Sequence, residues 1–249
     1  NSDVVSQAIF GSNIDVVATQ GEWVQIRTPD EYTGWTLSSG LVHVPPGEAV
    51  YANFGEVAQV TSLAANLYRE TDITKHAPIL ELPFDSMLEI VSGPTDNGRW
   101  FQVRLPDLRV AWIQSGDITG QPRTISIPES IELGKRFLGV TYTWGGRSSF
   151  GFDCSGFTQM ILHHRGINMP RDADLQAAWS GVVSVERKNL KPGDLLFFGS
   201  SAEHITHTGM YIGNGEFIHD TTHDRPMVQI SRLDDQPWTR LLVACRRVK

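Results

Sequence analysis

One cysteine stands where a helix is expected to begin. Cys154 follows Asp153 and precedes a Ser-Gly pair and apolar residues at helical spacing. The first turn of a helix carries unpaired N–H groups and the positive end of the helix dipole, which favour a thiolate and so a nucleophile. With Asp153 as N-cap and Gly166 as stop, we expect a helix over 154–165. Cys154 is its candidate nucleophile, and the alternative is a small buried core residue.

Several histidines could accept the proton of such a nucleophile. His207 and His219 lie in strand-like segments, and His204 and His223 compete with them. Amide hydrolysis needs a nucleophile, a base that later protonates the leaving amine, and donors for the oxyanion. The alternative of a zinc site is disfavoured, because no C-x-x-C pair supplies its ligands and only His219 and His223 have an H-x-x-x-H spacing. We therefore expect Cys/His hydrolase chemistry with no metal and no cofactor.

Short motifs surround these residues. In order they are Tyr142-Thr-Trp-Gly-Gly, Asp153-Cys-Ser-Gly, Leu190-Lys-Pro-Gly-Asp, His207-Thr-Gly-Met-Tyr-Ile-Gly and Phe217-Ile-His. Over roughly residues 125–249 this string resembles the NlpC-type family of bacterial cell-wall cysteine peptidases. In that family the cysteine of the D-C-S-G motif is the nucleophile, the histidine of the next motif is the base, and a polar residue on the following strand orients it. The resemblance assigns these roles to Cys154, His207 and His219.

The resemblance also implies a substrate. Relatives that join this domain to bacterial SH3 units cleave peptidoglycan stem peptides between γ-D-Glu and the diamino acid, often requiring a free N-terminal L-Ala. By position, Asp153, Ser155 and Tyr32 would bind the amine end of the peptide. Tyr142 would join the Cys154 N–H in binding the oxyanion; the alternative is a core tyrosine. Two other functions stay open: a catalytically weak wall-binding protein, and an N-acyl amidase or acyltransferase using the same Cys/His site.

Composition restricts the partners and the compartment. The net charge is −7 and the pI about 5.6, with no run of Lys or Arg, which argues against a nucleic-acid partner. No apolar run reaches the ~18 residues that a membrane span needs. The chain starts at Asn1 rather than Met, so we expect either a processed signal or an artificial boundary there. We expect an envelope location, with cytoplasmic recycling as the alternative. We expect a monomer without a disulfide framework, and Cys245 in a buried strand.

The first half of the chain contains an internal repeat. Residues 21–38 and 98–115 share eight identities in 18 positions at a constant offset of 77. Alternating apolar residues and turn residues predict short antiparallel strands, and two such units resemble bacterial SH3 domains. We expect the repeated tryptophans to be core residues rather than ligand platforms.

The repeat and the motifs together predict three domains. We expect one SH3-like barrel over 1–48, a second over 49–121, and the peptidase domain over 122–249, where Ser126 and Glu129 predict a capping box. Helices followed by antiparallel strands indicate an α+β class. The resemblance sharpens this to a papain-like, NlpC-type domain preceded by two small all-β SH3-like barrels.

The strand pattern constrains the two histidines. A plain two-residue turn at Asn214-Gly215 pairs 213 with 216 and puts His207 and His219 on opposite faces of the hairpin. Side chains on opposite faces of a sheet cannot contact each other. We therefore expect a three-residue turn with a bulge, or an equivalent one-residue bulge lower down.

Overall fold

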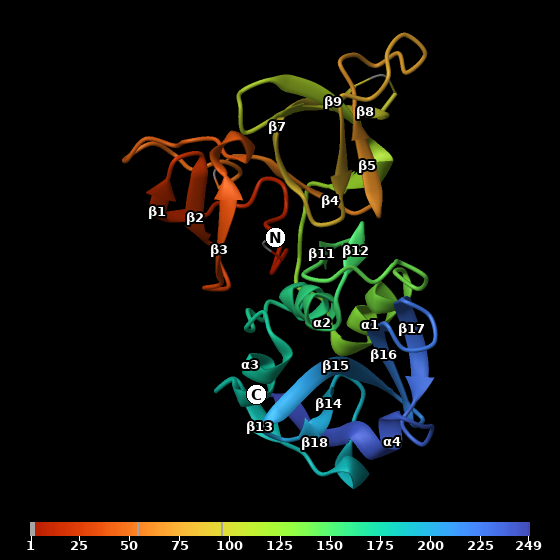
Figure 1. Ribbon diagram of the computed structural model, residues 1–249. Helices are drawn as coiled ribbons and strands as arrows, with labels where there is room; N and C mark the ends of the chain where they lie inside the picture. The colour runs from red at the N-terminus through yellow and green to blue at the C-terminus, as the bar shows by residue number, and fades with distance from the viewer. Residues whose placement is uncertain (1–2, 54, 96) are drawn as a thin grey trace. The chain divides into compact units, whose positions relative to one another are not determined.

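The computed structural model describes residues 3–53, 55–95 and 97–249. The chain divides into two compact units (Figure 1). The all-β unit comprises residues 8–122 and 148–150, and the α+β unit comprises residues 123–147 and 151–249 together with 3–7 at the N-terminus. The expected domain boundaries at residues 48 and 121 stay a prediction.

The all-β unit is built from three antiparallel sheets. Their strand orders are β1-β2-β3, β10-β4-β7-β8-β9 and β5-β6. The strands are β1 (Asp15–Gln20), β2 (Trp23–Arg27), β3 (Thr33–Leu37), β4 (Val57–Val60), β5 (Ala64–Leu67), β6 (Leu80–Pro83), β7 (Met87–Thr95), β8 (Trp100–Arg104), β9 (Val110–Gln114) and β10 (Ile118–Thr119), with 3-10 turns η1 (Ser38–Gly40) and η2 (Ser115–Asp117).

The sequence repeat is also a structural repeat. Trp23 pairs with Leu37 across β2 and β3, and Trp100 pairs with Gln114 across β8 and β9. Both partners are offset by the same 77 positions, since 23 + 77 is 100 and 37 + 77 is 114. The two hairpins therefore have the same register, which confirms the strands predicted for the repeat.

The two copies differ in what covers their tryptophans. Trp100 is 2% exposed and meets the ring of Tyr68 edge-on at a centroid distance of 5.6 Å. Tyr68 follows β5, so the β5–β6 hairpin covers this copy. Residues 8–14, which precede β1, contain no strand, and Trp23 and Trp35 are 45% and 46% exposed. The core expectation is thus confirmed for Trp100 and wrong for the first copy, because its covering hairpin is absent among the described residues.

The α+β unit contains a six-stranded antiparallel sheet with helices against it. The strand order is β13-β18-β14-β15-β16-β17. Its elements are α1 (Ile127–Lys135), β11 (Arg147–Ser148), β12 (Gly151–Phe152), α2 (Cys154–His163), α3 (Ala173–Ala178), β13 (Val182–Ser184), η3 (Arg187–Asn189), β14 (Leu195–Ser201), β15 (His204–Gly213), β16 (Glu216–Thr221), β17 (Met227–Arg232), α4 (Trp238–Leu241) and β18 (Leu242–Val248).

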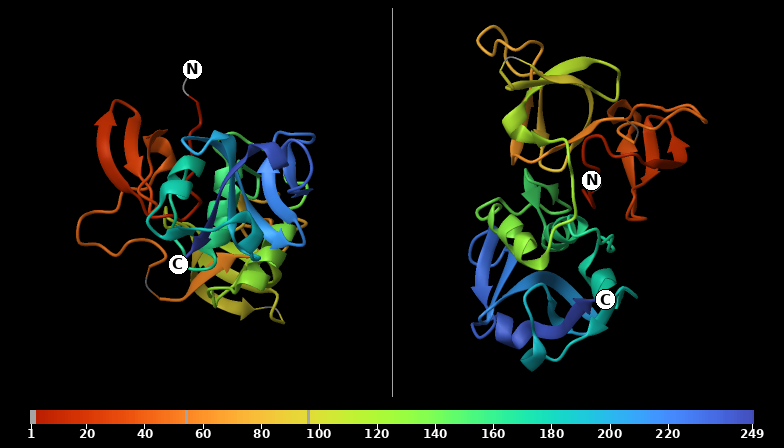
Figure 2. Two further views of the ribbon diagram at one scale, coloured as in Figure 1. Left: turned by 90° about the horizontal axis from the view of Figure 1, so that it is seen from below. Right: turned by 180° about the vertical axis from the view of Figure 1, so that it is seen from behind.

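Local signals start both main helices where the sequence predicts. Ser126 and Glu129 form a reciprocal capping box at α1. Gly134 of α1 faces Ile161 of α2 and Ile218 of β16, and a Cβ at residue 134 would lie 3.1 Å from the Ile161 side chain. Both helices therefore pack closely on the same face of the sheet, as Figure 2 shows from two further sides.

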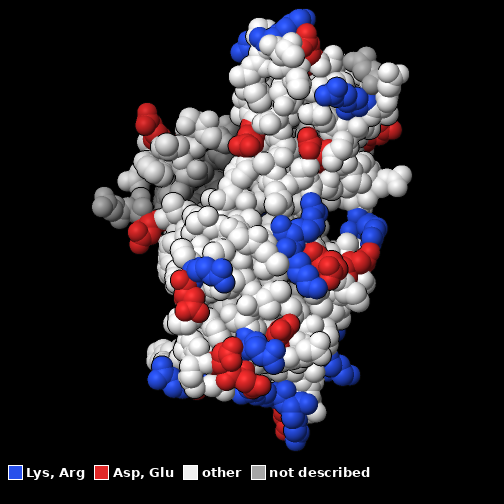
Figure 3. Space-filling view, turned by 90° about the vertical axis from the view of Figure 1, so that its right-hand side faces the viewer, with Lys and Arg blue, Asp and Glu red and all other residues white. Residues whose placement is uncertain are grey.

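The opposite face of the sheet holds a second apolar cluster. Its buried members are Leu196, Phe198, Phe217, Leu233, Trp238 and Cys245. Cys245 lies in β18 and is a free thiol, as expected. In the part of the chain that is described, no helix is long and apolar enough to cross a membrane. On the face drawn in Figure 3, acidic and basic side chains are intermingled.

The repeat offers a matched pair of substitutions. Trp100→Ala should lower the free energy of unfolding of the all-β unit by about 3–5 kcal/mol, because it empties a buried site. Trp23→Ala should cost less than about 1 kcal/mol, since half of that side chain already meets solvent. Denaturant unfolding of both variants measures the difference, and equal losses would contradict the assignment of Trp100 as the only core tryptophan of the pair.

Candidate active site

Cys154 lies in the first turn of α2, as predicted. The side chain of Asp153 caps this helix by accepting a hydrogen bond from the Gly156 N–H at 2.7 Å. Burial raises the pKa of the Cys154 thiol to about 12, and the Asp153 charge adds to the rise. The N–H groups of Thr208 and Ser155 act in the opposite direction by favouring the thiolate. The Thr208 contact brings the segment of β15 that contains His207 against the nucleophile.

His207 and His219 are in direct contact. His207 Nε2 lies 2.7 Å from His219 Nδ1, and His219 Nε2 lies 3.0 Å from the hydroxyl of Ser231 on β17. Three side chains on three neighbouring strands thus form one hydrogen-bonded row. A row of this kind fixes the ring plane and the tautomer of the histidine at its end, which is the part that an orienting residue plays in a catalytic triad.

The predicted register shift is present at the β15–β16 hairpin. Gly213 pairs with Glu216 around a two-residue turn, but Tyr211 pairs with Phe217, so Ile212 is a one-residue bulge. The bulge restores the match between the faces, because His219 then lies opposite Gly209, where a Cβ would be 2.9 Å from the His219 Cβ. The second form of the prediction, a bulge below the turn, is confirmed.

Aromatic rings enclose both imidazoles. The ring of Trp238 lies 5.2 Å from that of His207 and 4.7 Å from that of His219. Burial lowers the pKa of His207 to about 3. It lowers the pKa of His219 well below the ordinary value, and the neighbouring His207 and His223 add to this effect. The Cys154 thiol and the His207 imidazole are therefore both held in their neutral forms in the free protein.

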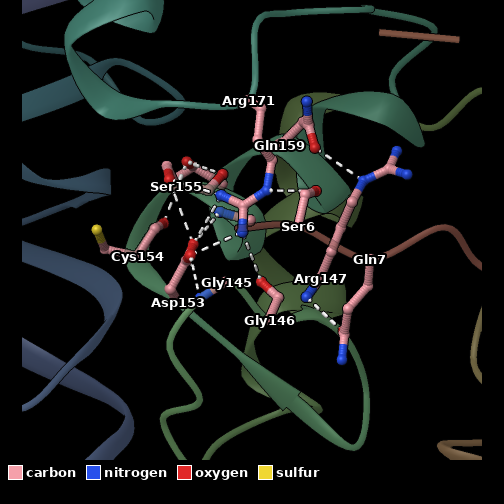
Figure 4. A network of polar contacts seen from close by, with 12 residues as sticks. Ser6, Gln7, Gly145, Gly146, Arg147, Asp153, Cys154, Ser155, Gln159 and Arg171 are labelled. Atoms are coloured by element: carbon pink, nitrogen blue, oxygen red, sulfur yellow. Dashed lines mark hydrogen bonds and ion pairs between the residues drawn. The ribbon is translucent and has the colours of Figure 1, made fainter. Parts of the chain in front are cut away.

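A buried guanidinium supports the start of α2 (Figure 4). Arg171 is 1% exposed, and its two terminal nitrogens bind the two oxygens of Asp153 at 2.9 and 2.7 Å. They also donate to the Ser155 hydroxyl at 2.9 Å and the Gly146 carbonyl at 3.1 Å. Asp153 additionally accepts from the N–H groups of Gly145 and Gly156 and from Ser155. Asp153 is thus fully engaged behind the nucleophile.

The N-terminal strap, residues 3–7, completes this network. The Ser6 hydroxyl accepts the remaining N–H of Arg171, at Nε, at 3.1 Å, so that all five guanidinium donors are used. The Gln7 side chain accepts the Arg147 N–H at 2.9 Å. A Cβ on residue 145 would lie only 2.3 Å from the Val4 carbonyl oxygen, and Gly145 has a φ of +73°. Glycine is therefore required at 145 for the strap to pass.

The structure places the predicted site residues in two groups. Cys154, Asp153 and Ser155 share the start of α2, while His207 and His219 share one face of β15–β16. Tyr142 is half-buried, and burial together with the charges of Cys154, Asp153 and Asp220 raises the pKa of its phenol, which stays protonated. Tyr32 lies in the turn between β2 and β3 of the all-β unit, and its contact with substrate stays a prediction.

Other members of the site were not predicted. Arg171 ends a Met-Pro-Arg segment whose residue types do not indicate its partner Asp153. Ser231 and Trp238 follow the histidine motifs without a distinctive pattern. Ser6 lies 165 positions before its partner Arg171, and nothing local in the sequence marks it.

Comparison with known proteins identifies the family. The family model described as "NlpC/P60 family" matches residues 139–247, and the model described as "Bacterial dipeptidyl-peptidase Sh3 domain" matches residues 1–41. The chain is 33% identical to the gamma-D-glutamyl-L-lysine dipeptidyl-peptidase of Bacillus cereus, over 97% of this chain and 74% of that protein. It is 31% identical to the protein of the same name from Bacillus subtilis, over 98% and 81%.

Solved structures agree with this comparison. The crystal structure of an NlpC/P60 family protein from Bacillus cereus matches with a TM-score of 0.82 and 31% identity, covering 98% of this chain and 81% of that one. An α+β domain with this helix-borne cysteine and histidine-bearing sheet is of the papain-like, NlpC type. The chain belongs to the NlpC/P60 family and has the N-terminal bacterial SH3 region expected from its repeat.

The strap can be tested through Ser6. Ser6→Ala should lower the free energy of unfolding of the α+β unit by about 1–3 kcal/mol, because it leaves a buried guanidinium N–H without an acceptor. Ser6→Thr, which keeps the hydroxyl, should restore most of the loss. Thermal unfolding is the measurement, with Val5→Ala at an exposed neighbouring position as the control. Equal effects of Ser6→Ala and Val5→Ala would show that the strap does not support the Arg171 network.

Proposed function

We propose that the protein is a cysteine peptidase that cleaves peptidoglycan stem peptides between γ-D-Glu and the diamino acid that follows it. The observations that carry this proposal are the hydrogen-bonded row of His207, His219 and Ser231, and a cysteine at a helix N-terminus that meets the N–H of Thr208, the residue after His207. The names of the two Bacillus relatives support the bond cleaved. A peptidoglycan fragment as substrate and a location in the cell envelope belong to the same proposal.

The first step is attack of Cys154 on the scissile carbonyl. Because burial favours the neutral thiol and the neutral imidazole, the proton leaves Sγ for His207 as the S–C bond forms, rather than from a preformed ion pair. The hydrogen bond between His207 Nε2 and His219 Nδ1 holds the His207 ring in one tautomer. The hydrogen bond between His219 Nε2 and the Ser231 hydroxyl does the same for His219. The result is a tetrahedral intermediate with a negative oxygen and an imidazolium.

Two donors are proposed for that oxygen. The Cys154 N–H points out of the first turn of α2, where no helical partner exists for it. The Tyr142 hydroxyl remains protonated because burial raises its pKa, so it is available as a donor. Preorganised donors at a developing oxyanion are worth about 3–4 kcal/mol each in the transition state.

The second half of the reaction regenerates the enzyme. Collapse of the intermediate breaks the C–N bond, and the His207 imidazolium protonates the leaving amine of the diamino acid. Water then attacks the resulting thioester, with His207 as base, and releases the γ-D-glutamyl carboxylate and the Cys154 thiol. Each proton that His207 accepts is returned within the cycle.

Recognition of a free amine is proposed for the cluster around Asp153. Arg171 balances the charge of Asp153, so the cluster offers polar edges rather than a bare carboxylate. Ser155 stands in the same cluster, and Tyr32 is proposed as the contribution of the SH3 region. A site built on such polar partners discriminates against a ligand that leaves them unpaired.

Two substrates test the proposal. The free tripeptide L-Ala-γ-D-Glu-L-Lys, or its diaminopimelate analogue, should be cleaved after γ-D-Glu. The same peptide acetylated at its amine should have a kcat/KM lower by about two orders of magnitude, because acetylation removes the ammonium donors. Chromatography of the products measures both. Equal rates would leave the activity standing and refute the amine recognition, while cleavage of neither peptide would refute the proposed function itself.

A further inference from the structure

Two polar side chains on the α2 side of the sheet are buried without partners. Thr208 and Asp220 are each 0% exposed. Among the described residues, the Thr208 hydroxyl and both carboxyl oxygens of Asp220 make no hydrogen bond of normal geometry, and only the Thr221 N–H lies close enough to favour the Asp220 carboxylate. Buried polar groups are almost always paired, because an unpaired one costs about 1–3 kcal/mol. Two such groups together therefore call for a functional explanation.

The register of the hairpin places these two residues opposite each other. Met210 pairs with Ile218, and continuing this ladder by two residues on each strand puts Thr208 across from Asp220. Alternate residues share a face, so Asp220 lies on the face of Ile218, which packs against α1 and α2. His219 points to the other face. Asp220 is thus on the side of the sheet where α2 begins.

The groups around Asp220 belong to the active site. Thr208 provides the N–H that favours the Cys154 thiolate. The charge of Asp220 acts on the Tyr142 phenol, together with those of Cys154 and Asp153. From α2, the charged group that faces Asp220 is Asp153, which raises its pKa. Arg171, the cation that pairs with Asp153, already spends its five donors on other acceptors.

A carboxyl group in such surroundings is expected to be neutral. Burial raises the pKa of Asp220 to about 8, the Asp153 charge adds to this, and the Thr221 N–H opposes it. The pKa values of the two other groups proposed for the reaction lie far from 7: about 12 for the Cys154 thiol and about 3 for the His207 imidazole. Asp220 is therefore the group of this site expected to change charge in mildly alkaline solution.

We propose that Asp220 is a positioning residue of the active site: it must hold its proton for the Cys154 thiolate to form readily. When Asp220 ionises, an uncompensated negative charge lies on the α2 side of the sheet, and like charge disfavours the thiolate. Asp220 touches no reacting atom and acts through the charge state of the site. The inference rests on the proposed role of Cys154 as the nucleophile, but its test needs no peptide substrate.

The experiment measures alkylation of Cys154 by iodoacetamide from pH 6 to pH 10, in the Cys245→Ala background. In the parent, the rate should rise with pH and then rise less steeply above about pH 8, where Asp220 ionises. Asp220→Asn carries a neutral group of nearly the same shape. It should match the parent at pH 6.5 and react roughly three- to tenfold faster at pH 9.5, the factor that a half to one unit of thiol pKa produces.

Asp224→Asn is the matched control. It removes the same charge from the turn between β16 and β17, close in sequence to Asp220, but at an exposed position whose side chain is 74% accessible. It should follow the parent at every pH. If Asp220→Asn does not fold, Asp220→Leu also removes the charge and keeps the branching of the side chain, although it is bulkier, and its alkylation rate should likewise rise without flattening above about pH 8. The proposal would be overturned if the alkylation rate of Asp220→Asn still rose less steeply above about pH 8. It would also be overturned if this variant were alkylated more slowly than the parent at all pH values.

Stability gives an independent readout with a defined sign. Between about pH 4, where an ordinary Asp ionises, and about pH 8, the folded protein retains a proton that the unfolded chain has lost. The parent should therefore lose stability as pH rises through this window, and Asp220→Asn should not. A constant difference in Tm between the two proteins over this window would contradict a neutral Asp220. Hydrolysis of the tripeptide is measured in parallel. If the parent cleaves the tripeptide but the Asp220 results are not as expected, this inference fails while the proposed peptidase activity stands.

Discussion

The ion pair between Arg171 and Asp153 is the interaction on which the rest of the site depends. A buried guanidinium is stable only when its donors are matched, and here all five are. The acceptors come from the strap, from the corner at Gly146 and from the start of α2. One side chain thus joins three segments that are distant in sequence. Because Asp153 is also the N-cap of α2, the same pair fixes the position of Cys154.

Burial determines the chemistry that this position allows. The Cys154 thiol is buried and the His207 imidazole is partly buried, and this loss of contact with water favours the neutral form of each. In the proposed reaction the proton therefore moves during the attack, which requires an imidazole in a fixed orientation. The row through His219 to Ser231 supplies that orientation, and the bulge at Ile212 makes the row possible. A single extra residue in one strand decides whether the two histidines can meet.

Much of this arrangement can be predicted from the sequence because its signals are local. The N-cap at Asp153, the capping box at Ser126 and the alternation that requires a bulge are each contained within a few residues. The sequence cannot show which distant residue satisfies a buried group. Ser6 is one serine among many until the fold brings it to Arg171, and Ser231 until β17 pairs with β16. Trp23 matches Trp100 in sequence, yet among the described residues only the second copy has a hairpin that covers its tryptophan.

The most direct test of the account is to trap its covalent intermediate. The enzyme is mixed with an activated ester of L-Ala-γ-D-Glu, quenched in acid within the first turnover, digested and analysed by mass spectrometry. The account predicts a dipeptidyl thioester on the peptide that contains Cys154, with none on the peptide that contains Cys245 and none in Cys154→Ala. Turnover of the ester by Cys154→Ala at the parent rate, or an acyl group on another residue, would contradict the central claim that Cys154 is the nucleophile.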